Sequence, residues 1–311
     1  MSEASSSVAE QGEYDRRLML VHAHPDDECL NNGATMARYV DDGAQVTLVT
    51  CTLGEEGEVL VPDLEHLAAE HTDALGLHRL SELTAAMGIL GVTDYVRLGG
   101  DGCYRDSGMT YDDRGHAVAR DVLRPGIFWT ADLLEAANHL VPLIRDRRPQ
   151  VLITYNEHGN YGHPDHIQAH RVAMYGYLLA GATSYRLDLG EPWRVDRVLW
   201  TTMSRSRALA QAENAAGTEY ENWGQAIQKG GPMESAFADD DEIAVGIDGT
   251  RWVRRKLDAL RAHATQVNTQ MFSLSDQLGE AVWSHEYYRL AAGAPFPAAD
   301  GFAHDLFDGL V

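Results

Sequence analysis

The sequence predicts an α/β fold built on a doubly wound, mostly parallel sheet with a smaller C-terminal addition. Short apolar runs alternate along the chain with longer segments whose apolar residues recur at helical spacing. This alternation is typical of parallel strands joined by helices. The pattern weakens after residue 203, and this change predicts the C-terminal addition.

Each predicted strand is short, and most are apolar throughout, as strands covered by helices on both faces should be. They span residues 18–21, 46–51, 95–98, 151–155, 198–200 and 243–247. Helices are predicted between them where apolar residues share one face, as Leu80, Leu83 and Leu90 do. The predicted helices span residues 32–42, 66–90, 133–144, 166–180 and 251–266.

With 311 residues, the chain is long enough for one large core and a further region. We expect residues 1–16 to be polar and disordered, 17–203 to form the Rossmann-type core, and 204–311 to complete the mouth of its site. The Gly- and Asp-rich stretch 99–128 has no clear periodicity, and so long a loop in a compact domain is usually functional.

Composition excludes several classes of partner. The chain carries 25 Lys and Arg against 47 Asp and Glu, a net charge of −22, which repels nucleic acids and anionic membranes. Its three cysteines form no CxxC pair, which argues against a disulfide framework. No signal pattern and no spanning apolar segment is present. We expect a cytoplasmic protein, and the sequence does not indicate its oligomeric state.

Two clusters of histidine and carboxylate residues follow predicted strands. Residues 24–28 read His-Pro-Asp-Asp-Glu after the strand at 18–21, and residues 161–166 read Tyr-Gly-His-Pro-Asp-His after the strand at 151–155. Ligands of open α/β sheets bind beyond the carboxyl ends of the strands. The two clusters are therefore expected to meet at one crevice.

Two imidazoles and one carboxylate form a three-ligand catalytic zinc set that leaves a position for water. Because Asp26 and Asp27 are adjacent, one can bind metal while the other acts as a general base. Fe²⁺ suits the same ligands as Zn²⁺. Alternatively, Asp27 caps the following helix. One His-Pro-Asp triplet alone favours neither interpretation, but two triplets at strand ends favour the metal site.

These motifs resemble the PIG-L/LmbE family of metal-dependent N-acetylglucosamine deacetylases. The resemblance covers most of residues 17–203, returns near 240–311, and includes the segments 51–58, 105–109 and 263–267. It implies a Rossmann-like sheet and hydrolysis of the N-acetyl group of N-acetylglucosaminyl-inositol to acetate and the free amine. Residues 110–130 and 204–240 match nothing in the family pattern.

By position, the resemblance implies His24, Asp27 and His166 as the metal ligands, for Zn²⁺ or Fe²⁺. It implies Asp26 as the general base and His163 as the acid or oxyanion partner.

The resemblance further implies that Asp165 orients His163, and a carboxylate neighbour is expected to raise the pKa of that imidazole. Tyr161 would help to polarise the amide carbonyl. The implied sugar-binding residues are Arg79, Asp106 and Glu58.

Two other functions remain open. One is a different enzyme of the same family, either an amidase that acts on mycothiol S-conjugates or a deacetylase of another N-acetylglucosaminyl compound. The other is a sugar-binding module that has lost catalysis, because a fold does not fix a function.

Overall fold

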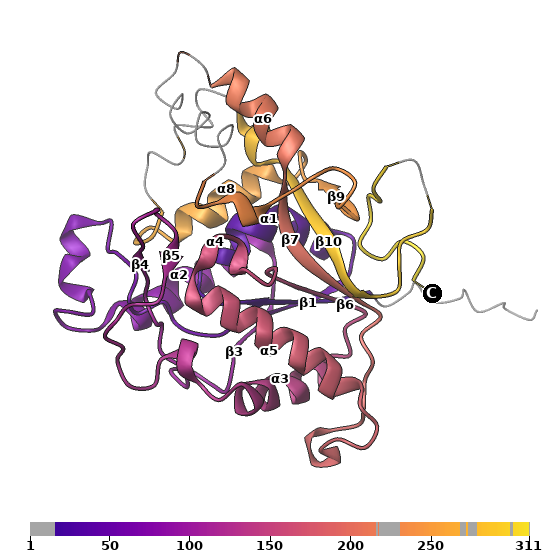
Figure 1. The fold of residues 1–311 in the computed structure, drawn as a ribbon, viewed down its shortest axis with the longest axis horizontal. Coiled ribbons are helices and arrows are strands. Elements are labelled where there is room, and N and C mark those ends of the chain that lie inside the picture. Colours follow the sequence, from indigo (N-terminus) through magenta and orange to yellow (C-terminus); the bar gives the residue numbers. More distant parts are fainter. Residues whose placement is uncertain are drawn as a thin grey trace, which may run out of the picture.

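The computed structural model describes residues 16–215, 217, 231–267, 272, 279–298 and 301–310. In that part of the chain, strands and helices mostly alternate as far as residue 204 (Figure 1). The strands are β1 Arg17–His22, β2 Gln45–Thr50, β3 Asp94–Arg97, β4 Thr110–Tyr111, β5 Ala117–Val118, β6 Val151–Thr154, β7 Arg197–Ser204, β8 Phe237–Ala238, β9 Val245–Asp248 and β10 His285–Gly293. The α-helices are α1 Asp27–Asp41, α2 Leu75–Leu90, α3 Leu133–Arg147, α4 Gly159–Gly162, α5 Pro164–Gly181, α6 Arg205–Asn214 and α8 Val253–Ala262. Short 3₁₀ turns are η1 Pro62–Leu67, η2 Phe128–Thr130, η3 Leu187–Leu189, η4 Glu234–Ala236 and η5 Glu280–Trp283.

The order of the strands brings the two polar clusters together. Parallel strands run in the order β3-β2-β1-β6-β7, and β10 and β9 continue the same sheet, with β10 antiparallel to both neighbours. The order reverses between β1 and β6, and a ligand crevice forms beyond the carboxyl ends of the strands at such a point. The loops after β1 and β6 carry the two clusters predicted from the sequence.

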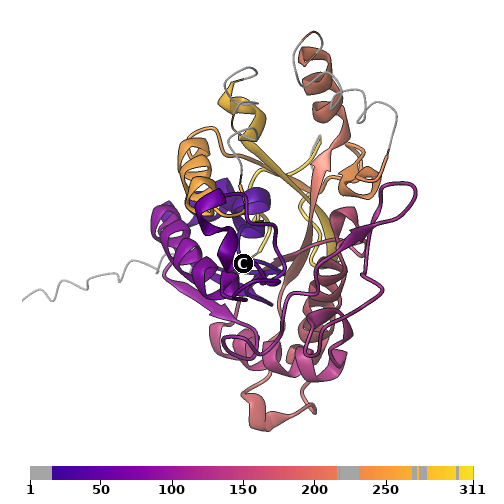
Figure 2. The same ribbon diagram turned by 90° about the vertical axis from the view of Figure 1, so that its left-hand side faces the viewer.

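Helices cover both faces of this sheet (Figure 2). Side chains of β1 alternate between the faces, as they must in a strand. Leu18 and Leu20 pack in the core shared with α1, α2 and α8, whereas Met19 and Val21 pack in the core shared with α3 and α5. The predicted doubly wound, mostly parallel α/β fold is confirmed.

Element boundaries differ from the predicted ones where polar residues or a backbone reversal intervene. Helix α1 begins at Asp27, five residues before the prediction at residue 32, because its first turn is polar and turned toward the site. The helix predicted over 66–90 begins only at Leu75, because Asp73 takes a left-handed φ of 54°. Strand β10 and helix α6 were not predicted.

The C-terminal region contributes to the main sheet. Strand β10 pairs with β7 and β9 pairs with β10, so residues beyond the predicted boundary at 203 extend the core sheet. The boundary itself stays a prediction. The disordered segment predicted over 1–16 lies outside the described residues except for Arg16. Among the described residues, no helix has the length and apolar character needed to cross a membrane.

Candidate metal and catalytic site

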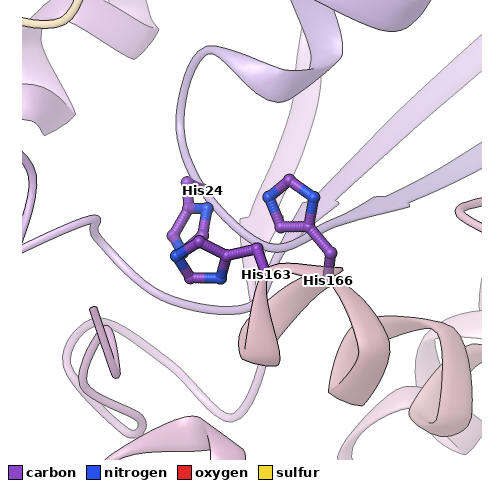
Figure 3. A group of neighbouring side chains, drawn as sticks. All are labelled: His24, His163 and His166. Atoms are coloured by element: carbon purple, nitrogen blue, oxygen red, sulfur yellow. The ribbon is translucent and has the colours of Figure 1, made fainter. Parts of the chain in front are cut away.

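Three buried imidazoles meet at the carboxyl ends of β1 and β6. His24 lies in the loop after β1, and His163 and His166 come from the start of α5 (Figure 3). The ring centroids of His24 and His163 are 4.6 Å apart, and those of His163 and His166 are 4.9 Å apart. The structure therefore brings together residues 139 positions or more apart in sequence, as the fold prediction required.

Asp27 lies between two of these rings. Its Oδ1 is 3.3 Å from Nε2 of His166, and its Oδ2 is 3.3 Å from Nδ1 of His24. Oδ2 also accepts hydrogen bonds from the backbone N–H of His24 at 2.9 Å and from the hydroxyl of Tyr155 at 2.7 Å. These bonds occupy Oδ2 and leave Oδ1 facing His166.

His24 and His166 each have a second ring nitrogen that faces a hydrogen-bond acceptor. Nε2 of His24 is 3.3 Å from Oδ2 of Asp165 and 3.4 Å from Oδ1 of Asp106. Nδ1 of His166 is 3.3 Å from the carbonyl oxygen of Gly159. Metal-binding histidines have such an acceptor behind them, because it fixes the tautomer and aims the free nitrogen at the metal.

The residues fit a divalent metal ion. Nε2 of His166 is buried and has no hydrogen-bond partner among the described residues, as expected of a nitrogen that binds a metal. Nitrogen atoms of His24, His163 and His166 also lie within 4.8 Å of one another. Asp27 is nearer to His24 and His166, at 3.3 Å from each, but His163 also lies within reach of an ion held between them, so both residues are candidates for the third ligand.

Asp26, the predicted general base, has an unusual backbone conformation with φ 113° and ψ −34°. Its side chain is 17% exposed, and its Oδ2 accepts a 3.0 Å hydrogen bond from Arg79. Burial raises the pKa of Asp26 to about 6, although Arg79 opposes the shift. A carboxylate with a pKa near 6 is well suited to accept a proton at neutral pH.

The pKa values of the other ionisable groups of the site are shifted by burial and by the charges of neighbouring groups. Burial would raise the pKa of Asp27, but His166 and His24 outweigh it and hold that pKa well below its usual range. Burial lowers the pKa of His166 to about 4. The pKa of His24 is raised: burial acts against the shift, but Asp106 and Asp165 outweigh it.

The predicted partnership between Asp165 and His163 differs from the observed one. The carboxylate of Asp165 accepts hydrogen bonds from the hydroxyl of Ser107 and, at 2.8 Å, from its backbone N–H. Only the backbone N–H of Asp165 contacts His163, donating to Nδ1 at 3.1 Å. The pKa of His163 is lowered rather than raised, by burial first and then by His24 and His166. The expected increase is therefore wrong.

The three predicted sugar-binding residues are in different environments. Arg79 is 2% exposed and donates to Asp26, to the carbonyl of Pro25, and to the carbonyl of Gly54 at 2.8 Å. Asp106 is buried beside His24, and its oxygens accept from the backbone N–H of Gly108 in its own loop and from that of Glu56 in the loop after β2. Glu58 is exposed, and the buried cluster does not include it.

Tyr161 lies against the rings of His163 and His166. Its ring meets that of His166 edge-on, with centroids 5.1 Å apart. Burial raises the pKa of its hydroxyl, so this group stays protonated and able to donate a hydrogen bond.

Comparison with known proteins identifies the family. The family model described as PIG-L, GlcNAc-PI de-N-acetylase, matches residues 19–176, which include both clusters. The chain belongs to the PIG-L family. This membership confirms the family predicted from the His-Pro-Asp triplets.

Curated PIG-L relatives match nearly the whole chain. A protein of Kribbella flavida, named 1D-myo-inositol 2-acetamido-2-deoxy-alpha-D-glucopyranoside deacetylase, is 53% identical over 95% of this chain and 98% of its own length. A protein of the same name from Nocardioides sp. is 51% identical over 96% of this chain and 99% of its own length. The fold is also that of N,N'-diacetylchitobiose deacetylase from Pyrococcus horikoshii, at a TM-score of 0.57, 17% identity, and coverage of 89% and 84% of the two chains.

Two residues that contact Asp27, His166 or Asp165 were not predicted as parts of the site. Tyr155 donates to Asp27 and stacks on His166, with centroids 4.3 Å apart. Ser107 holds Asp165 from the long loop between β3 and α3. Their signals were present, since Tyr155 ends the clearest apolar run and Ser107 lies in the 105–109 motif, but neither residue type indicates a metal site by itself.

Proposed function

We propose that this PIG-L deacetylase removes the N-acetyl group of 1D-myo-inositol 2-acetamido-2-deoxy-α-D-glucopyranoside in mycothiol biosynthesis, with a divalent metal ion as cofactor. The observation that carries the proposal is the pairing of a metal-fitting triad with a separate carboxylate of raised pKa. Relatives named for this reaction align with nearly the full chain, which supports the choice of substrate. The reaction is expected to take place in the cytoplasm.

His24, Asp27 and His166 would hold the metal. Two observations support this set: the acceptors behind His24 and His166, and the absence of a hydrogen-bond partner for Nε2 of His166 among the described residues. Zn²⁺ is the proposed ion, and Fe²⁺ would suit the same ligands. When bound, the ion supplies Lewis-acid chemistry, lowering the pKa of water and polarising the acetamide carbonyl.

Asp26 would take the proton from the attacking water. The carboxylate of Asp26 is more exposed than that of Asp27, and it pairs with Arg79 rather than with the imidazoles. This position leaves it available to a water molecule, while Asp27 is committed to His24 and His166. Proton removal by a well-placed base typically contributes about 10²- to 10⁴-fold to a rate.

His163 would donate a hydrogen bond to the oxyanion. Because its Nδ1 accepts from the backbone N–H of Asp165, the neutral ring carries its proton on Nε2. An N–H donor fixed in this way stabilises the charge that develops on the carbonyl oxygen of the acetamide. When the C–N bond breaks, the amine would receive its proton from the carboxyl group of Asp26, which holds the one taken from the attacking water. Tyr161, protonated and beside His166, would add a second donor.

The sugar and inositol hydroxyls would contact polar residues around the cluster of histidines. Asp106 and Glu58 remain the proposed sugar-binding groups, Glu58 because it is exposed on the loop next to Asp106. For Arg79 the contacts to Asp26, Pro25 and Gly54 support a different role, as the residue that positions the base. The partner is a small, uncharged glycoside, in keeping with a chain of net charge −22.

The deciding experiment measures acetate and free amine released from the sugar–inositol substrate, beside free N-acetylglucosamine and a mycothiol S-conjugate. We expect the sugar–inositol acetamide to be turned over fastest. Preferential cleavage of the S-conjugate would make the protein an amidase of the same family. Sugar binding without release of acetate, in protein with about one metal ion per chain, would instead favour the non-catalytic binding module.

A further inference from the structure

The proposed base has a backbone conformation that must be held in place. Asp26 has φ 113°, in the region that non-glycine residues rarely adopt. Such a conformation persists only when surrounding contacts determine it, and it is found most often at functional sites. What holds Asp26 therefore bears directly on catalysis.

One contact to the Asp26 backbone comes from a fully buried carboxylate. Oε2 of Glu28 accepts a 2.9 Å hydrogen bond from the backbone N–H of Asp26. The other oxygen, Oε1, accepts from Nε2 of His263 at 2.9 Å and from the thiol of Cys29 at 3.0 Å. Glu28 and His263 both have 0% exposure, so neither can exchange its partner for water.

His263 comes from a distant part of the chain and is firmly anchored. It follows the last residue of α8, and the turn after it is tied to α2 by Thr265, whose N–H and hydroxyl donate to Glu82 at 2.9 and 2.7 Å. The backbone N–H of Leu60 donates to the carbonyl of Thr265 at 2.9 Å. Segment 263–267 thus connects α8, α2 and the loop after β2 behind the base.

We propose that His263 is a positioning residue for deacetylation, acting through Glu28 to fix Asp26 at the angle from which it accepts the proton of water. Without the hydrogen bond from His263, the buried carboxylate of Glu28 would rotate toward another donor. This rotation would displace the hydrogen bond that Glu28 accepts from the backbone N–H of Asp26. The cluster of Glu28, Cys29 and His263 has the donor types of a metal site, but its members are already hydrogen-bonded to one another through Oε1 of Glu28. It therefore acts as a support.

This inference rests on the proposed function and on Asp26 as its base. The test compares His263→Phe, which removes the donor and keeps the bulk, with His263→Gln, whose amide can still donate to Glu28. The matched control is Glu82→Gln, which removes the charge of another buried carboxylate at the same turn, keeps an oxygen that can accept from Thr265, and does not touch Asp26. For each variant, kcat, KM, metal content and thermal unfolding are measured.

We expect His263→Phe to lower kcat by about 10- to 100-fold, with KM and metal content near wild type, because a displaced catalytic group is costly in rate. His263→Gln should recover most of this loss, and Glu82→Gln should leave kcat near wild type. If His263→Phe does not fold, Glu28→Gln tests the proposal in its place. This variant should lower kcat and keep its metal.

Wild-type kcat in folded His263→Phe, or equal losses in that variant and in Glu82→Gln, would overturn the proposal. So would an unchanged kcat in Glu28→Gln where His263→Phe does not fold. Absence of turnover in the metal-loaded wild-type protein would overturn the proposed function instead. The two failures are therefore distinguishable.

Discussion

The hydroxyl of Tyr155 donates a 2.7 Å hydrogen bond to Oδ2 of Asp27, while the ring of Tyr155 stacks on His166 at 4.3 Å. One side chain thus orients two of the three proposed metal ligands. The same hydroxyl accepts from the backbone N–H of Ala23, which fixes its own direction. Groups that orient ligands in this way are part of a metal site although they never touch the ion.

Tyr155→Phe should therefore weaken metal binding while keeping the stack on His166. Loss of an outer partner of a ligand typically costs about 10- to 100-fold in metal affinity or activity. Competition with a chelator of known affinity measures the change. Tyr185→Phe, which removes a 2.7 Å hydrogen bond to Asn138 far from the cluster, is the control and should bind metal as the wild type does. Equal metal affinities in the wild type, Tyr155→Phe and Tyr185→Phe would show that Tyr155 does not support metal binding.

Asp26→Asn and Asp27→Asn should separate the two adjacent carboxylates. Asp26→Asn is expected to keep the metal and to lower kcat by about 10²- to 10⁴-fold, because an amide cannot accept the proton of water. Asp27→Asn is expected to lose metal affinity, since Asp27 faces both His24 and His166. Metal analysis of the purified variants beside turnover measures both effects. The opposite result, with metal lost from Asp26→Asn and kept in Asp27→Asn, would exchange the two roles.

His163→Ala decides between the two candidates for the third ligand. If Asp27 is that ligand, His163→Ala should retain about one metal ion per chain and should lose at least about 10²-fold in kcat, because an oxyanion donor is missing. KM should change little. Loss of the metal from His163→Ala with retention in Asp27→Asn would instead assign the ligand role to His163, in line with its closeness to His24 and His166.

The fold and the two clusters could be predicted because they depend on local patterns. Apolar runs such as residues 18–21 and 151–155 read directly as buried strands, and each His-Pro-Asp triplet lies within a few residues of a strand end. The start of α1 was predicted too late because its first turn, from Asp27, is polar for reasons of chemistry rather than of packing. A hydrophobic pattern cannot show such a turn.

The supporting contacts could not be predicted because they join distant segments. Tyr155 reaches Asp27 across 128 positions, and Arg79 reaches Asp26 across 53. Glu56, whose side chain is 5% exposed, is paired with Arg105 and Arg120 from the long loop after β3. In each case the partner is chosen by tertiary packing, and the residue type alone fits a surface position equally well.

Arg197 is expected to be costly to replace. It is fully buried in β7, and its guanidinium donates to the carbonyls of Ala294, Pro295, Leu306 and Asp308 while lying 3.6 Å from the ring centroid of Phe296. Arg197→Met would leave these buried carbonyls unpaired and lower the free energy of unfolding by about 2 to 5 kcal/mol. Denaturant unfolding measures the change.

The control for Arg197 is Arg254→Met. Arg254 is an exposed residue of α8 whose ion pair with Glu280 lies at the surface. Exposed pairs of this kind contribute little to stability. Similar unfolding curves for Arg197→Met and the wild-type protein would show that the C-terminal segment does not depend on this contact.

Arg79→Met tests whether this arginine binds sugar or positions the base. Its guanidinium is bonded to Asp26, Pro25 and Gly54, so the substitution should lower kcat on the sugar–inositol acetamide and on free N-acetylglucosamine by a similar factor. The ratio of the two kcat/KM values should stay near that of the wild type, because specificity follows groups that touch the hydroxyls. Asp106→Asn, at a proposed sugar-binding residue, should instead bring the two kcat/KM values closer together. Arg79→Met could instead bring the two kcat/KM values closer together and leave kcat on free N-acetylglucosamine unchanged. Arg79 would then be a sugar-binding residue, as the family resemblance implies.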